Sequence, residues 1–433
     1  MAVFTFSLNF RAQNSFRFKN PTKKRQCIVF KVINNLIIIP LEINGRELSF
    51  ILDSGVSKTI LFNITKRDSL GLNDVQKVLL QGLGKGEAVE ALISYKNKVS
   101  IKSLVSTNET IYVILDDYFD LSSKMGETIH GIIGYDLLKN FIVKINYQSK
   151  KIDFYKPENY RYKKCRKCET FPIELYRNKP YINLNVQIDT VGKKLTNVKL
   201  LIDSGGSDAI WLFEDSKEDV KTPQLFFNDI LGEGLSGTIY GNRSRIPKIK
   251  LGSFEIENPT VSFLDTISSK NARNFKARNG SLGGGILKRF TIWLDYPNKQ
   301  IKLKKNRFFK SSFNYDMSGL DVVYTGKQLV KEVESDITKY KLAKNNSVTF
   351  ITNFSYKFKP SYKIKAVTKN SAADKVGIKE GDIILAINRK SAHSYKLSDI
   401  VNKLQEKENK KIRIKIKRNG VEMIFEFRLE KKI

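Results

Sequence analysis

Two aspartates at the ends of apolar runs are the residues best suited to chemistry. Asp53 lies in F-I-L-D-S-G at 50–55, and Asp203 lies in L-L-I-D-S-G at 200–205. Each apolar run predicts a buried strand, and the glycine permits a tight turn that holds the carboxylate at the rim of a core. Two carboxylates a few ångströms apart cannot both ionise readily, so one can act as a general base and the other as a general acid. A single Asp-Ser-Gly is also an ordinary turn, so the pattern is informative because it occurs twice.

Each copy has a matching partner downstream. The run G-I-I-G-Y-D-L-L-K-N-F begins at Gly131, and G-S-L-G-G-G-I-L-K-R-F begins at Gly280. Their second glycines, Gly134 and Gly283, follow the aspartates by 81 and 80 positions. The parallel continues into I-N-Y-Q-S-K-K-I and L-D-Y-P-N-K-Q-I. A duplication with a period near 150 residues is too long for a solenoid and predicts two homologous lobes.

Over Val32 to Lys305, this doubled pattern resembles the two-lobed aspartic peptidases, the family of the pepsin-like and retropepsin-like enzymes. The resemblance implies a mainly all-β fold in which two homologous lobes form a cleft. It also implies that Asp53 and Asp203 are a catalytic pair that activates a water to cleave extended polypeptides. Neither a metal nor another cofactor is expected.

The resemblance assigns supporting roles to six further residues. Two hydroxyls would lock the aspartate loops together, two amides would donate to the carboxylates, and two glycines would let the chain pass under the loops: Ser54 and Ser204, Gly55 and Gly205, Gly134 and Gly283, respectively. A hairpin flap over the cleft is expected at Leu83, Gly84, Lys85 and Gly86, with a counterpart in lobe two at 232–238. No helical pattern or Lys-Ser/Thr pair follows the first of these glycine-rich segments, so a nucleotide-binding loop is excluded.

One departure from the family bears on pH. In many relatives that act in acid, a Ser or Thr follows Asp-Ser/Thr-Gly and donates to the carboxylate. Val56 and Gly206 stand at these positions. Because a lost donor to the charged form raises the pKa of a carboxyl, activity is expected to shift toward neutral pH.

The C-terminal part changes character. The run S-A-A-D-K-V-G-I-K-E-G-D-I-I-L-A-I-N at 371–388 resembles bacterial PDZ domains, with an amphipathic helix expected at Leu397–Leu404 and a hairpin turning at Asn419-Gly420. PDZ domains bind a peptide C-terminus by strand addition. The glycine-containing carboxylate loop is not evident in 357–364, so peptide binding by this copy stays open. The expected organisation is an N-terminal tail or remnant signal segment (1–26), lobe one (27–155), a linker (156–168), lobe two (169–306), a connector (307–348) and a small α+β PDZ domain (349–433).

Composition limits the other functions. The 433 residues include 76 Lys and Arg against 44 Asp and Glu, a formal charge of +32 that attracts polyanions or acidic substrates. The basic residues are spread along the chain without a nucleic-acid module, so no nucleic-acid partner is expected.

Cys165 and Cys168 lack nearby zinc ligands, which leaves a local disulfide or two free thiols. No apolar run is long enough for a transmembrane helix. We expect a monomer in a bacterial cell envelope, periplasmic or secreted, with a cytoplasmic location as the alternative.

Two other functions remain open from the sequence. The first is a peptidase fold that no longer cleaves and acts as a scaffold through its cleft and PDZ domain. The second is a basic surface protein that binds polyanions, which salt would disrupt.

Overall fold

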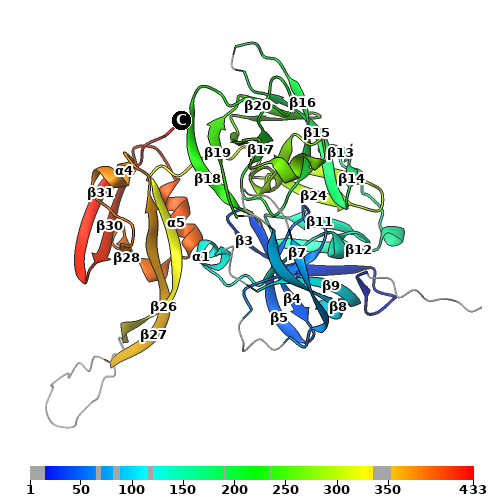
Figure 1. Ribbon diagram of the computed structural model, residues 1–433, viewed down its shortest axis with the longest axis horizontal. Coiled ribbons are helices and arrows are strands. Elements are labelled where there is room, and N and C mark those ends of the chain that lie inside the picture. The colour runs from blue at the N-terminus through cyan, green and yellow to red at the C-terminus, as the bar shows by residue number, and fades with distance from the viewer. Residues whose placement is uncertain are drawn as a thin grey trace, which may run out of the picture. The chain divides into compact units, whose positions relative to one another are not determined.

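The computed structural model describes residues 15–64, 70–80, 88–115, 120–189, 191–234, 237–334 and 353–433. The chain forms two compact units. The larger unit contains both lobes, and the smaller one consists of Leu121–Glu127 together with Asn314–Lys432. Strands dominate both units, as the short alternating apolar runs predict (Figure 1).

Lobe one is built on a nine-stranded sheet in which the strand that leads to Asp53 is central. Its β4–β5 hairpin turns at Asn44-Gly45, where both residues have positive φ, as the Asn-Gly signal predicts. Strand β10, which begins the downstream glycine motif at Gly131, runs parallel to β5 and antiparallel to β6. The strands are β1 (Arg17–Phe18), β3 (Lys31–Ile33), β4 (Leu36–Ile43), β5 (Arg46–Leu52), β6 (Thr59–Leu61), β7 (Asn73–Leu80), β8 (Val89–Ile101), β9 (Leu104–Ile114) and β10 (Gly131–Ile133), followed by helix α2 (Tyr135–Leu138).

Lobe two repeats this plan in a ten-stranded sheet. Here β23 runs parallel to β16, the strand that leads to Asp203, and antiparallel to β17. The elements are β14 (Glu174–Tyr176), β15 (Lys179–Gln187), β16 (Thr196–Ile202), β17 (Ile210–Phe213), β18 (Phe226–Gly234), β19 (Gly237–Arg245), β20 (Lys248–Leu251), β21 (Phe254–Glu257), β22 (Thr260–Leu264), the 3₁₀ helix η2 (Lys270–Asn274), β23 (Gly280–Leu282) and α3 (Gly284–Leu287).

A six-stranded sheet joins the two lobes. The repeated hairpins meet in it, because β11 pairs antiparallel with β24 from the other lobe. Its strands are β2 (Arg25–Val29), β11 (Ile142–Asn146), β12 (Lys151–Tyr155), β13 (Cys168–Pro172), β24 (Phe290–Asp295) and β25 (Gln300–Lys305), with η1 (Pro157–Asn159) between β12 and β13. One continuous hydrophobic core extends through both lobes.

The smaller unit contains a six-stranded sheet ordered β26-β27-β28-β30-β31, with β29 at the side of β28. Helix α5 and the final hairpin lie where the sequence predicts them. Its elements are α1 (Leu121–Met125), β26 (Leu320–Glu334), β27 (Asn353–Val367), α4 (Ala372–Lys375), β28 (Ile383–Ile387), β29 (Lys390–Ser391), η3 (Ala392–Ser394), α5 (Leu397–Leu404), β30 (Lys411–Arg418) and β31 (Val421–Arg428).

The segment boundaries differ from expectation at two places. Strand β26 lies in the segment expected to be a connector, and it pairs with β27 along most of its length, so the C-terminal part of this unit begins at Asn314 rather than at residue 349. In the expected N-terminal tail, Phe16 and Phe18 are buried in the lobe core and β1 pairs with β9. The burial of two large aromatic side chains in the hydrophobic core stabilises the docked position of this segment.

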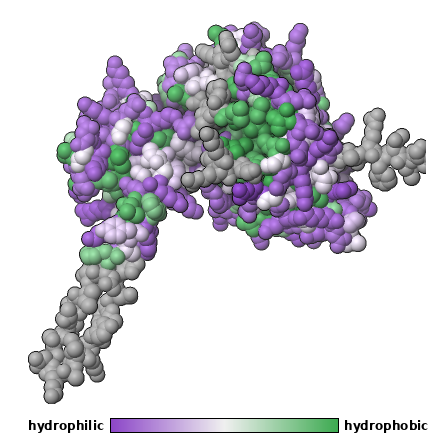
Figure 2. All heavy atoms as spheres, turned by 60° about the horizontal axis from the view of Figure 1, so that its bottom comes forward, coloured by the Kyte–Doolittle hydropathy of each residue, from purple (hydrophilic) through white to green (hydrophobic). Residues whose placement is uncertain are grey.

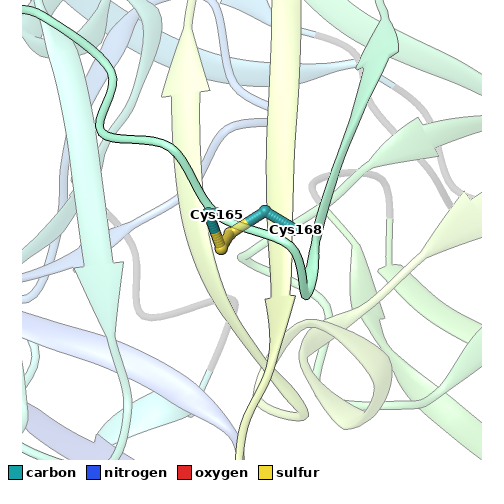
Figure 3. Close-up of a disulfide and its surroundings, with 2 residues drawn as sticks. All are labelled: Cys165 and Cys168. Atoms are coloured by element: carbon teal, nitrogen blue, oxygen red, sulfur yellow. A yellow bond between two sulfur atoms is a disulfide. The ribbon is translucent and has the colours of Figure 1, made fainter.

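Of the two cysteine alternatives, the disulfide is present: Cys165 and Cys168 are bonded (Figure 3), and Cys27 is free. No helix among the described residues is long and apolar enough to span a membrane. Hydrophilic residues cover most of the face in Figure 2, with one hydrophobic area on the larger unit.

Candidate active site

Asp53 and Asp203 lie at matching points of the two lobes. Each follows directly after a strand, β5 or β16, whose parallel neighbour accepts a hydrogen bond from the aspartate amide. The Asp53 N–H donates to Ile133 O at 2.9 Å, and the Asp203 N–H donates to Leu282 O at 3.0 Å. The parallel pairing therefore anchors the backbone of both carboxylates.

Two buried serines tie the aspartate loops to each other. Ser54 Oγ donates to Ile202 O at 2.7 Å and accepts the Ser204 N–H at 3.1 Å. In return, Ser204 Oγ donates to Leu52 O at 2.8 Å and accepts the Ser54 N–H at 2.9 Å. The four bonds are reciprocal between the lobes, so they fix the separation of the carboxylates.

The glycines after the serines lie against the carboxylates. The Gly55 N–H donates to Asp53 Oδ1 at 2.6 Å, and the Gly205 N–H donates to Asp203 Oδ1 at 3.2 Å. A Cβ on Gly55 would lie 3.1 Å from Asp53 Oδ1 and 3.4 Å from Asp203 Oδ1, so both carboxylates border the same point. A Cβ on Gly205 would lie 2.3 Å from Asp53 Cγ. Only glycine fits at position 205.

Gly134 and Gly283 lie beneath the loops. A Cβ on Gly134 would lie 1.9 Å from Asp53 O, and one on Gly283 would lie 3.0 Å from Gly206 O and 2.3 Å from Asp208 O. Backbone approaches this close exclude a side chain, so both glycines permit the crossing of the chain that the motif spacing implies.

The surroundings of Asp53 favour its protonated form. Burial raises the pKa of Asp53 to about 7, and the charge of the neighbouring Asp203 acts in the same direction. The amides of Gly55 and Gly205 oppose this rise by donating to the carboxylate. Asp53 is therefore suited to hold the shared proton near neutral pH.

Asp203 has cations and a hydroxyl beside it. Burial raises the pKa of Asp203, but the charges of Arg278 and Lys179 and a hydrogen bond from Ser281 stabilise its ionised form. Arg278 Nη2 donates to Ser281 Oγ at 2.7 Å, which leaves the Ser281 hydroxyl hydrogen for Asp203. Arg278 Nε also donates to Gly280 O at 3.1 Å. Arg278 and Ser281 are 6% and 4% exposed, so water screens this chain of contacts little.

Sequence reasoning missed Arg278, Ser281 and Lys179. The expected effect of Gly206 is offset, because Ser281 supplies a hydroxyl to Asp203 from the neighbouring strand. The signal was present in the repeat: G-S-L-G in lobe two replaces G-I-I-G in lobe one, so Ser281 stands where lobe one has Ile132. The expected flap residues Leu83, Gly84, Lys85 and Gly86 lie outside the described residues. The arms of that hairpin are β7 and β8, and lobe two has β18 and β19 at the corresponding place.

The residues that the structure describes contain no group of three or more His, Cys, Asp or Glu that could hold a metal ion. The polar side chains at this point are the two carboxylates of the dyad, the two cations Arg278 and Lys179, and the hydroxyl of Ser281. This set suits proton transfer between a water, a carbonyl and the carboxylates.

Two segments of the chain match models of known protein families. Residues 39–137 match the family model described as aspartyl protease, and residues 363–418 match the model of the PDZ domain. Among solved structures, the aspartic proteinase from Irpex lacteus aligns at 13% identity and a TM-score of 0.45, covering 67% of this chain and 100% of that one. No curated protein matches the chain. The chain thus contains a region similar to aspartyl proteases at 39–137, followed by a region similar to PDZ domains at 363–418.

Proposed function

We propose that this protein is an aspartic endopeptidase that hydrolyses peptide bonds of extended polypeptides with a water activated between Asp53 and Asp203. The observation that supports this most is the unequal environment of the two carboxylates. Burial raises the pKa of both carboxyls and Lys179 favours ionisation of both, but Arg278 and the Ser281 hydroxyl stabilise the charge of Asp203, whereas the like charge of Asp203 raises the pKa of Asp53 further. A pair with opposite protonation preferences provides a base and an acid at one pH.

The roles follow from these preferences. The Asp203 carboxylate takes a proton from the water, whose oxygen attacks the scissile carbonyl carbon while Asp53 donates its proton to the carbonyl oxygen. The product is a neutral gem-diol, with Asp203 protonated and Asp53 ionised. Asp203 then donates its proton to the leaving nitrogen as the C–N bond breaks, and Asp53 takes a proton from one gem-diol hydroxyl. The dyad returns to its starting state without a covalent intermediate.

The test is cleavage of an unfolded protein substrate between pH 4 and pH 8 by the wild type, Asp53→Asn and Asp203→Asn, read by mass spectrometry. Each substitution removes one proton carrier, so both variants are expected to lose at least about a thousandfold in kcat/KM. Asp153→Asn is the matched control, because Asp153 is a buried carboxylate of the larger unit, bonded to Arg25 outside the dyad.

Full activity in either dyad variant would refute the proposal. Absence of cleavage by folded wild type at every pH would instead favour a non-cleaving scaffold that uses the same cleft.

We further propose an oxidising location outside the cytoplasm, which the Cys165–Cys168 disulfide supports because such bonds persist in oxidising compartments.

A further inference from the structure

The smaller unit offers one sheet edge of the kind to which PDZ domains add a peptide strand. Strand β26 is an end strand of the sheet, paired with β27 on one side, and it contacts helix α5. Peptides bound by strand addition lie along such an edge and are held at their terminal carboxylate by backbone N–H groups. A peptide would therefore be expected to add along the edge of β26 beside α5, and this edge is called the groove from here on.

A segment from elsewhere in the chain already lies at this groove. Helix α1 belongs to the smaller unit and contacts both β26 and α5 (Figure 1). Met125, at the end of α1, is 7% exposed. A Cβ on Gly126, which has a φ of +67°, would lie 2.8 Å from Cβ of Leu397, the first residue of α5. The segment Leu121–Glu127 is thus packed tightly against the helix that flanks the groove.

Side chains on both faces of β26 are buried near the start of the strand. Successive side chains of a strand point to opposite faces, yet Val322 and Val323 are both buried. Val322 belongs to the hydrophobic core of the smaller unit, and Val323 does not. Both faces of β26 are therefore covered at this point.

Polar groups of the loop that precedes β26 form hydrogen bonds with one another. Gly319 has a φ of +82°, and its N–H donates to Asp316 Oδ2 at 2.5 Å. Ser318 Oγ donates to Asp316 Oδ1 at 2.8 Å and accepts the Leu320 N–H at 3.1 Å. Met317 N–H donates to the carbonyl of Leu404, which places the loop at the C-terminal end of α5. Residues 357–364, where the sequence shows no such glycine-containing loop, lie within β27, and the loop with Gly319 instead precedes β26.

We infer that the PDZ groove binds the chain itself: Leu121–Glu127 covers the edge of β26, and the Asp316 carboxylate takes the N–H group of Gly319 that a ligand's terminal carboxylate would need. The partner that this surface fits is an internal segment, and an external peptide must displace it. Because the segment is covalently attached, its effective concentration is on the order of millimolar or more, and the apparent affinity for any free peptide falls by the occupied fraction. The inference does not depend on peptidase activity.

Hydrogen exchange of the full-length protein tests this, because a five-residue helix is not stable unless it is docked. In the wild type, the amides of 121–127 and the first half of β26 are expected to exchange slowly. Met125→Asp places a charge in a buried position outside the core of the smaller unit and is expected to accelerate exchange in both segments by about tenfold or more, while β30 and β31 stay protected.

Gly126→Ala is a second, milder variant with a matched control. Its added Cβ meets Leu397 Cβ, whereas Gly71→Ala adds a Cβ at a similar φ of +53° with no atom within 4 Å. Gly126→Ala is expected to accelerate exchange in 121–127, and Gly71→Ala is expected to leave it unchanged. The inference is overturned if wild-type 121–127 exchanges as fast as an unstructured peptide, or if neither Met125→Asp nor Gly126→Ala alters exchange in β26.

Discussion

Ser281→Ala gives the sharpest test of how the dyad is tuned. Its hydroxyl accepts from Arg278 Nη2 at 2.7 Å and donates to the ionised Asp203. A hydrogen bond to a charged group contributes about 1.5–3 kcal/mol, and one pKa unit corresponds to about 1.4 kcal/mol. Removal of the hydroxyl is therefore expected to raise the pKa of Asp203, because the ionised form loses this stabilisation.

The pH profile of kcat/KM shows this directly. The lower limb reports the first ionisation of the dyad and should move up, while the upper limb reports its second ionisation, near pH 7, and should stay in place. Because the carboxylates titrate as a pair, the limbs belong to the dyad. Below the wild-type lower limb, kcat/KM should fall by about tenfold to a hundredfold.

Ser281→Thr is the matched control, since it keeps the hydroxyl and should keep the wild-type profile. Ser281→Ala also removes an acceptor from the buried Arg278, so the free energy of unfolding should fall by about 1–3 kcal/mol. A lower limb that does not move in folded Ser281→Ala would refute the role of this hydroxyl. A thermal unfolding curve distinguishes that result from simple loss of folded protein.

Three further predictions concern the same unit. Gly205→Ala forces a Cβ to within 2.3 Å of Asp53 Cγ, so hydrolysis by the folded variant should drop by at least about a hundredfold; near wild-type kcat would contradict the tight fit. Lys179→Gln removes a cation that favours ionisation of both carboxylates, so both limbs of the pH profile should move up, and an unchanged or lower profile would exclude this electrostatic role. Replacement of Cys165 and Cys168 by serine opens a short loop, so urea denaturation should show a loss of about 2 kcal/mol with little change in kcat; loss of the fold would contradict a purely local role.

The sequence predicted the parts of the fold that contain the duplicated motifs. The doubled Asp-Ser-Gly and the glycines some eighty residues later identify residues that the structure brings together at one point between the lobes. The disulfide could be stated only as one of two alternatives, because sequence spacing does not report oxidation state. The hairpin at Asn419-Gly420 was predictable because its turn chemistry is local.

The missed features depend on contacts between distant segments. Ser281 reaches Asp203 only through the parallel register of β23 and β16, and Arg278 acts on Asp203 both by its charge and by its hydrogen bond to Ser281. Strand β26 lies in a segment whose polar composition is typical of a connector, and its pairing with β27 is a tertiary contact that composition does not report. No local signal marks 121–127 as part of the smaller unit, since its docking is purely tertiary.

The most direct test of the central claim is calorimetric binding of a statine-containing peptide, whose hydroxyl imitates the gem-diol intermediate, to the wild type and to Asp203→Asn at pH 6. If the two carboxylates form one catalytic site, the wild type should bind the mimic and the variant should bind it at least about a hundredfold more weakly, because transition-state mimics depend on the groups that stabilise the intermediate. Equal affinity for both proteins would contradict a catalytic dyad of Asp53 and Asp203.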